Sequence, residues 1–134
     1  LWSRLIHAIA GPPVHCILVV PTGSNGRYVG VHAVAGAGVE RVELTAAQRT
    51  ADRWELVPVP RCDALTALAF AERRIGARYD YVGAALYGTP LTHRSRWTCS
   101  ELCAEALVAG GAPLALLDAG RTPRRLLAAL RGLA

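Results

Sequence analysis

The sequence predicts an α+β fold in which an antiparallel sheet packs against helices. The first half alternates β-branched runs with clusters of turn-forming residues, and the second half holds runs of helical period that begin at capping residues and end at glycine. The chain has 134 residues, 52% of them hydrophobic and 19% charged, which is typical of one globular domain. We therefore expect a single domain over residues 1–134.

Strands are expected wherever apolar residues run together or alternate with polar ones. The segment PTGSNGR at residues 21–27 is dense in turn formers, so the runs on either side of it predict a hairpin. The four expected strands are Val14–Val20, Tyr28–Val34, Val39–Leu44 and Trp54–Val59.

Helices are expected where a capping residue precedes a run of helical period. The expected helices are Ser3–Ala10, 45–52, one capped by Asp63 and running to Ile75, one opened by Thr98 and closed at Gly110, and one from Thr122 to Gly132. In the third of these, Leu65, Leu68, Ala69 and Ile75 are expected near one face, and Gly76 should adopt a left-handed C-terminal conformation. Residues 77–97 are expected to be irregular and rich in aromatic side chains.

Charge and hydropathy exclude several classes of protein. All fifteen cationic residues are Arg, and the net charge is +5. Because these residues form no dense basic run, we expect no nucleic-acid partner, although an anionic cell-wall polymer is compatible with the charge. No apolar stretch is long enough to predict a transmembrane segment, and no signal peptide is expected in this chain. Export through an upstream segment and a cytoplasmic location both stay open, as does the oligomeric state.

Cys99 is the first candidate for chemistry among four cysteines that we expect to be free thiols. If Thr98 caps the helix, Cys99 lies in its first turn, where the helix dipole and free N–H groups stabilise a thiolate. A thiolate is a nucleophile, and neighbouring N–H groups can stabilise a tetrahedral oxyanion. The alternative is a small buried residue at a helix start, and that is the role expected for Cys103, one turn further on.

Two histidines are candidates for the general base and its orienting group. His15 opens the first expected strand and His32 lies on its hairpin partner, so their side chains can meet on one face. His15 and Cys16 should point to opposite faces, so only one of them should reach Cys99. His7 is expected at the surface.

The motifs around these residues resemble those of NlpC/P60 peptidases. The segments that match are IGARYDYVGAALYGTPLTHRSRWTCSELCAEALVAGGAPL, RTPRRLLAAL, VHCILVV and GVHAV. Both histidines precede the cysteine here, whereas typical members place the cysteine first. The chain therefore resembles the circularly permuted branch, which includes YiiX-like papain-fold amidases and the lecithin:retinol acyltransferase group.

The resemblance implies a permuted papain-like fold and assigns roles to individual residues. It makes Cys99 the nucleophile, His15 the base and His32 the orienting residue, and it gives the Tyr79 hydroxyl a part in the oxyanion site. Many permuted members have an acidic residue where His32 stands. The residues expected near substrate are Ser100, Asp80, Tyr81 and His93.

The function implied is that of a cysteine amidase or peptidase that cleaves peptidoglycan stem peptides through an acyl-enzyme, without a metal or other cofactor. The partner would then be a peptide substrate. Two alternatives stay open: a lipid acyltransferase or thioesterase that uses the same cysteine and histidine on an acyl substrate, and a non-catalytic interaction domain. A metal site made by His15, His32, Cys99 and Cys103 is disfavoured, because their spacing is unlike that of usual zinc sites.

Overall fold

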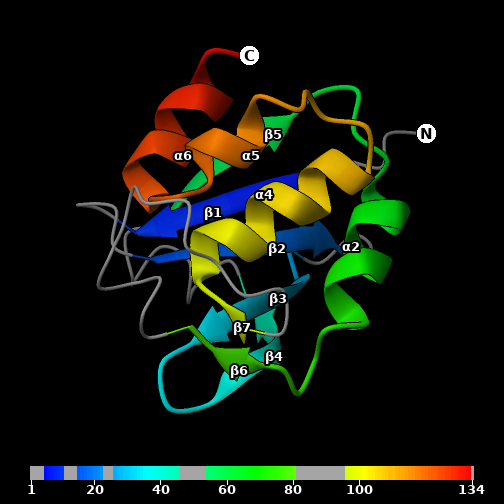
Figure 1. The fold of residues 1–134 in the computed structure, drawn as a ribbon. Coiled ribbons are helices and arrows are strands. Elements are labelled where there is room, and N and C mark those ends of the chain that lie inside the picture. Colours follow the sequence, from blue (N-terminus) through cyan, green and yellow to red (C-terminus); the bar gives the residue numbers. More distant parts are fainter. Residues whose placement is uncertain (1–4, 11–14, 23–25, 46–53, 81–95, 134) are drawn as a thin grey trace.

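The computed structural model describes residues 5–10, 15–22, 26–45, 54–80 and 96–133, in which a five-stranded antiparallel sheet packs against helices (Figure 1). The strand order is β4-β3-β2-β1-β5. The predicted α+β class with an antiparallel sheet is therefore confirmed. The strands are β1 (Leu5–Ala10), β2 (His15–Pro21), β3 (Tyr28–Val34), β4 (Gly38–Leu44) and β5 (Trp54–Val59).

A second, much smaller sheet pairs two segments in parallel, β6 (Arg78–Tyr79) and β7 (Arg96–Trp97). The prediction that residues 77–97 are wholly irregular is wrong at 78–79 and 96–97, because these two short segments pair with each other as strands. The helices are α2 (Ala64–Glu72), α4 (Cys99–Ala109), α5 (Leu116–Ala119) and α6 (Pro123–Arg131). The helix predicted at 45–52 lies almost entirely outside the described residues. None of the helices in the described ranges combines the length and apolar character that a membrane span requires.

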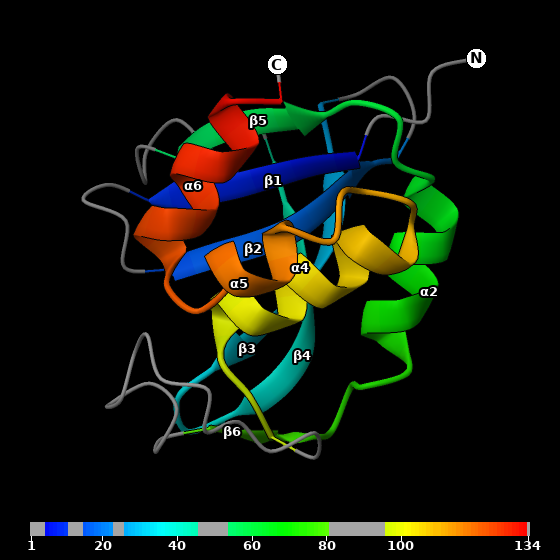
Figure 2. The same ribbon diagram turned by 45° about the horizontal axis from the view of Figure 1, so that its top comes forward.

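The main core lies between the sheet and the helices. Figure 2 shows α4 crossing the sheet near β2, with α6 beside β5 and α2 at the opposite flank. The fully buried side chains of this layer include Leu18 and Val31 from the sheet and Leu102, Leu107 and Leu126 from the helices. Burying each such side chain contributes about 1.5–3 kcal/mol, so this layer fixes how α4 sits on β2.

The N-terminal segment is a strand, so the helix predicted for Ser3–Ala10 is wrong. Within Leu5–Ala10, every residue pairs with β5, and all but the first also pair with β2. A helix of this length is marginal in water, whereas two flanking strands satisfy the backbone on both edges. The tertiary pairing therefore overrides the local helical spacing.

Helix α2 buries mainly its small residues. Of the residues predicted near one face, Leu68 is partly buried against the core, whereas the other three are exposed. Ala64, Ala67 and Ala71 are buried, whereas Leu65 is 70% exposed and Ile75 is also exposed. The reason is the close approach of α2 to the end of α4, where a Cβ added to Gly110 would lie 2.7 Å from the Cys62 Sγ and 3.1 Å from the Ala67 Cβ. Only small side chains fit between the two helices. Gly76 has the predicted left-handed conformation, with φ of 94°, but the predicted extension of the helix to Ile75 is wrong, because α2 ends at Glu72 with Arg73 as its C-cap.

The two predicted caps in the second half are confirmed. The Thr98 hydroxyl accepts a hydrogen bond from the Glu101 N–H, while the Glu101 carboxylate accepts from the Thr98 N–H, which is a complete capping box. Thr122 caps α6 by accepting from the Arg125 N–H, with Pro123 at the first helical position. The capping box starts α4 at Cys99.

Candidate active site

Cys99 is the first residue of α4, and its position is fixed by the packing of the residues before it and by the capping box after it. Before it, Trp97 is buried and packs edge-to-face on Phe70 at 6.2 Å between ring centroids. The Arg74 guanidinium lies 3.3 Å from the Phe70 ring centroid, which adds a cation–π contact. After it, the capping box fixes the first helical turn. Cys99 itself is only 1% exposed.

His15 and His32 meet as the hairpin predicted, and a carboxylate extends the pair. His15 Nε2 lies 2.9 Å from His32 Nδ1, and His32 Nε2 lies 3.1 Å from Glu40 Oε1. The pairing of β2 with β3 begins at Leu18, so His15 lies beyond the paired part of the two strands. Its ring can therefore reach both His32 and the start of α4.

Cys99 is a thiolate at neutral pH. Its pKa falls from the ordinary thiol value of 9.0 to about 4. The hydrogen bond from the Cys16 thiol is the largest cause, and burial opposes it. The hydrogen bond and positive charge of His15 lower the pKa further, and the Cys16 backbone adds a hydrogen bond. The sulfur is thus charged although it is buried, because three groups compensate its lost hydration.

The pKa values of the two histidines shift in opposite directions. Burial lowers the pKa of His15, but the hydrogen bond and negative charge of Cys99 outweigh it and raise the pKa above 6.5. Burial and the positive charge of His15 lower the pKa of His32, against the effect of Glu40. Whenever His15 is protonated and His32 is neutral, His15 donates from Nε2 to His32, which then donates from its own Nε2 to Glu40. Nδ1 of His15 is left to face Cys99.

Cys16 also contacts Cys99, so the expectation that only one of His15 and Cys16 reaches this residue is wrong. Cys16 lies on the helix-facing side of β2 and is fully buried. Burial raises its pKa well above 9.0, and hydrogen bonds to Cys103 and Cys99 raise it further, so its thiol keeps its proton and donates it. Alternation along the strand places the Cys16 side chain towards the helices and predicts that His15 points away from them. His15 departs from this prediction because it lies at the end of the strand.

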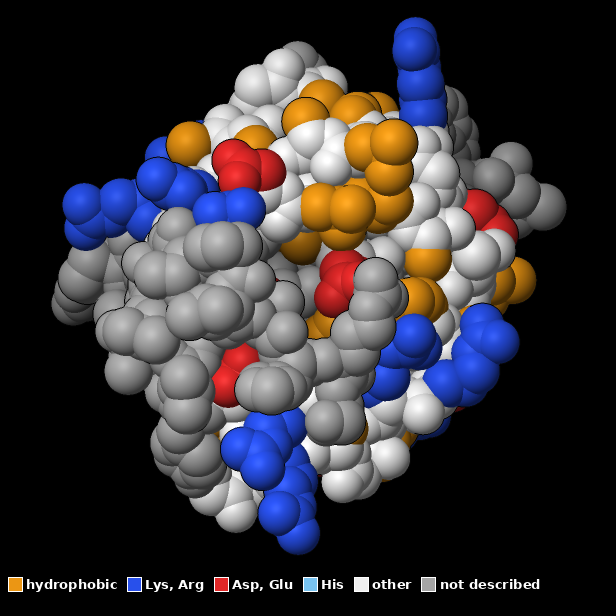
Figure 3. Space-filling view, viewed as in Figure 1, with side chains coloured by type: hydrophobic (Ala, Val, Ile, Leu, Met, Phe, Trp, Pro, Cys, Tyr) orange, Lys and Arg blue, Asp and Glu red, His pale blue; other side chains and the backbone are white. Residues whose placement is uncertain are grey.

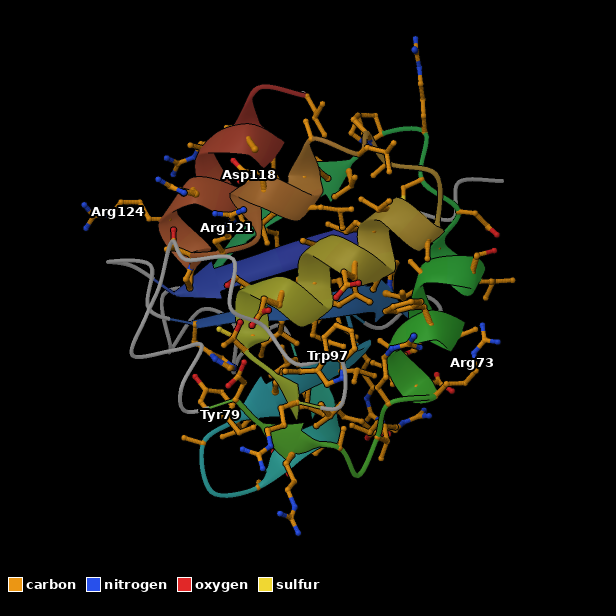
Figure 4. The ribbon with its side chains drawn as sticks, viewed as in Figure 1. Arg73, Tyr79, Trp97, Asp118, Arg121 and Arg124 are labelled. Carbon is orange, nitrogen blue, oxygen red and sulfur yellow. The ribbon has the colours of Figure 1, made fainter. Side chains whose placement is uncertain are left out.

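The remaining described candidates surround the start of α4. Tyr79 packs on the main core, and Figure 4 shows it below α4 in this view, on the strand next to that of Trp97. Asp80 is buried, and its N–H donates to the Trp97 carbonyl at 3.1 Å. Ser100 is fully buried, and its hydroxyl finds no hydrogen-bond partner among the described residues. Substrate-contact roles for these residues stay predictions.

Two of the predicted substrate contacts, Tyr81 and His93, lie outside the described residues. Within the described ranges, no three His, Cys, Asp or Glu side chains are placed to hold a metal ion. The four residues of the disfavoured metal alternative are therefore not arranged as a metal-binding group.

Glu40 is a site residue that the sequence analysis did not single out. It lies directly opposite His32 in the β3–β4 pairing, and its side chain is 48% exposed. The alternation of VERVEL predicts a half-exposed strand, but only the register shows which of its two glutamates faces His32. Counting back from the turn at residues 35–37 would have found that register.

Comparison with protein-family models, with curated proteins and with solved structures finds no significant match for this chain. The geometry of this chain is therefore the basis on which roles are proposed for its residues.

Proposed function

We propose that this chain is a thiol hydrolase that cleaves amide bonds, with Cys99 as nucleophile, His15 as acid and base, and His32 as the orienting residue. The observation that supports this most is the continuous series of hydrogen-bonded groups from Cys99 through His15 and His32 to Glu40. A nucleophile, a base and an orienting group in this order are what covalent catalysis of acyl transfer requires.

In the first half-reaction, the Cys99 thiolate attacks the carbonyl carbon of the amide. The backbone N–H groups of Cys99 and Ser100 lie in the first helical turn, where no preceding helical carbonyl can accept from them, and they stabilise the oxyanion. His15 gives its Nδ1 proton to the leaving nitrogen as the C–N bond breaks. An amine leaves, and a thioester links the acyl group to Cys99.

In the second half-reaction, neutral His15 takes a proton from water, and the resulting hydroxide attacks the thioester. The C–S bond breaks, a carboxylic acid is released, and the thiolate–imidazolium pair returns. His32 keeps Nδ1 of His15 aimed at the sulfur in both steps, because it holds the opposite ring nitrogen. The Tyr79 hydroxyl is a further candidate for the oxyanion site.

Peptidoglycan stem peptides are the proposed substrate class, and acyl esters are the comparison class. The purified protein is incubated with each, and release of amine or alcohol is followed together with the mass of the protein. We expect amide turnover and a transient mass increase on Cys99 that Cys99→Ala abolishes. Ester turnover without amide turnover would assign the site to acyl transfer instead, and folded protein inert towards both would contradict the proposal.

A further inference from the structure

Three of the four cysteines meet where α4 crosses the sheet near β2 (Figure 2). Cys16 lies on the face of β2 that packs against the helices, with Leu18 in the same core cluster, whereas Ile17 lies on the opposite face. Cys99 and Cys103 are one turn apart on the buried side of α4. The Cys16 thiol is hydrogen-bonded to both of them. The three sulfur atoms therefore form one cluster that joins the sheet to the helix.

The surface carries no thiol that could link two copies of the chain. All four cysteines are buried and free. Hydrophobic side chains gather over α4 and α5 in Figure 3, but the large exposed ones in the described part of the chain are leucine and isoleucine, namely Leu65, Ile75, Leu114 and Leu117. A disulfide between two copies needs an exposed sulfur on each. Oxidation of the folded protein is therefore confined to pairs of thiols within one chain.

Within the cluster, one pair is suited to a disulfide that includes Cys99. A disulfide requires Cβ atoms about 3.5–4.5 Å apart. Residues four positions apart on a helix have Cβ atoms about 5–6 Å apart, so Cys99 and Cys103 cannot close a bridge without distorting α4. Cys16 comes from a different element and faces α4 across the core, and its thiol already contacts the Cys99 sulfur through a hydrogen bond. Cys16 is therefore the partner for Cys99.

Cys99 is the sulfur that an oxidant attacks first. Thiolates react with peroxides, whereas neutral buried thiols are inert. The pKa of Cys99 falls to about 4, while that of Cys16 is raised well above 9.0 by burial. His15, which is hydrogen-bonded to Cys99, is only partly buried. The sulfur thus lies directly beneath a side chain that reaches the surface, and a reagent as small as hydrogen peroxide needs little more room than a water molecule.

We propose that Cys16 and Cys99 form an oxidation site at which a hydroperoxide converts the two thiols into a reversible disulfide, with Cys16 as the resolving cysteine. The Cys99 thiolate attacks the terminal peroxide oxygen and the O–O bond breaks. The departing oxygen takes a proton from the His15 imidazolium and leaves as water or an alcohol, so that Cys99 becomes a sulfenic acid, oxidised by two electrons. The Cys16 sulfur then attacks the Cys99 sulfur. The S–S bond forms, the S–O bond breaks, and the Cys16 proton leaves with the hydroxyl as water.

The first step prepares the second. The negative charge of Cys99 contributes to the raised pKa of Cys16, and a sulfenic acid does not carry that charge. Oxidation of Cys99 therefore makes the Cys16 thiol easier to deprotonate while the two sulfurs are already in contact. The disulfide protects Cys99 from oxidation to the sulfinic acid, which thiols do not reverse. While the bridge is present, the Cys99 thiolate is absent and any reaction that needs it stops.

The test follows the mass of the protein and does not depend on amide turnover, because the inference goes beyond the proposed hydrolysis. The reduced full chain, freed of reductant, is treated with a small molar excess of hydrogen peroxide. It is then denatured in N-ethylmaleimide and digested without reduction. We expect a peptide pair linked through Cys16 and Cys99, a loss of two of the four alkylated thiols, and recovery of all four after dithiothreitol.

Two serine variants locate the bridge. Cys16→Ser keeps a hydroxyl that donates to Cys99 but cannot form a disulfide, so Cys99 should accumulate as sulfinic and sulfonic acid that dithiothreitol does not restore. Cys103→Ser removes the neighbouring thiol and should leave the bridge unchanged. Cys62, whose pKa rises to about 11, is the internal control and should stay reduced throughout. If Cys16→Ser loses its thermal transition, the peptide map of the parent decides alone.

The outcomes separate this site from the hydrolase proposal. All four thiols unmodified after peroxide, irreversible oxidation of Cys99 in the parent while Cys16 stays free, or a bridge between Cys99 and Cys103 would each overturn the oxidation site, even if amide turnover is observed. A reversible bridge between Cys16 and Cys99 in a protein that cleaves no amide would support the oxidation site and count against the hydrolase.

Discussion

Cys62 and Cys99 are both buried cysteines at the start of a helix, yet the fold shifts their acidity in opposite directions. The pKa of Cys62 rises to about 11, and that of Cys99 falls to about 4. Burial raises the pKa of Cys62, and the negative charge of Asp63 raises it further. A backbone hydrogen bond from Ala112 lowers this pKa, but only in part. Burial acts on Cys99 as well, but the hydrogen bond from Cys16 and the charge of His15 overcome it.

The difference shows that a helix start does not by itself lower the pKa of a cysteine. Cys62 donates its proton to the Leu107 carbonyl at 3.4 Å, which favours the neutral thiol. Cys99 accepts hydrogen bonds, which favours the thiolate. The direction of the hydrogen bonds and the sign of the neighbouring charge therefore decide whether the pKa of each thiol rises or falls.

The largest expected effect comes from removing each sulfur in turn. Cys99→Ala should lower amide turnover at least about 10³-fold, because no covalent intermediate can form. Cys62→Ala should leave turnover within about twofold and reduce stability by about 1 kcal/mol through loss of its hydrogen bond. Steady-state kinetics and chemical denaturation of both variants measure this. Similar losses of activity in the two would remove the distinction between the cysteines.

The next effect is that of His15→Ala, which should lower turnover about 10²–10⁴-fold. The variant should raise the pKa of Cys99, because it removes a hydrogen bond and a positive charge, and leave that of Cys62 unchanged. In the parent, the thiolate is present above about pH 4 and the imidazolium below the raised pKa of His15, so activity should be bell-shaped between them. A rate that is indifferent to His15, or that rises monotonically with pH, would count against the pair.

The caps of the two helices should differ in their contribution to stability. Thr98→Ala removes the hydroxyl half of the α4 capping box, leaves the bond from the residue 98 N–H to the Glu101 carboxylate, and should cost about 1 kcal/mol. Asp63 makes no side-chain hydrogen bond to the backbone of α2, so Asp63→Ala should cost less. The Asp63 variant should also lower the pKa of Cys62, since it removes a negative charge. Urea denaturation gives the two free energies of unfolding, and a larger cost at Asp63 would contradict the assignment of the caps.

The smallest effect expected is that of Glu40→Gln, a positioning residue two hydrogen bonds from the nearest reacting group. Turnover should fall about threefold, and the pKa of His32 should fall further, because Glu40 raises it. Glu43→Gln removes the same charge from the same strand without touching His32 and is the matched control. Histidine titration by nuclear magnetic resonance, with kinetics, tests this, and identical results for the two variants would exclude a role for Glu40.

The parts of the molecule that sequence predicted well are those fixed by local chemistry. Thr98 and Glu101 have capping-box spacing, and Thr122–Pro123 is a helix start in any context. The sequence predicted that His15 and His32 meet, because the segment at residues 21–27 is rich in turn-forming residues and therefore predicts a hairpin. These features gave the helix-start cysteine and the histidine pair of the candidate site.

The parts that sequence missed depend on neighbours far along the chain. The apolar spacing of the six residues of β1 is compatible with a helix or with a strand. Only their pairing with β2 and β5 makes them a strand. The contact of Cys16 with Cys99 requires α4 to lie on β2, and the pairing of Arg78 with Arg96 joins strands of two residues each. The role of Glu40 needs the register of β4, which alternation alone does not specify.

The most direct test of the account is the rate at which iodoacetamide alkylates Cys99 and Cys62 in one folded sample, followed by mass spectrometry from about pH 4.5 to 9. Both sulfurs are largely buried, so denatured protein supplies the rates of ordinary thiols. We predict a Cys99 rate that is already at its plateau near pH 6, and a Cys62 rate that stays low throughout. A Cys99 rate that climbs about tenfold per pH unit up to pH 8, as that of an ordinary thiol does, would contradict the account.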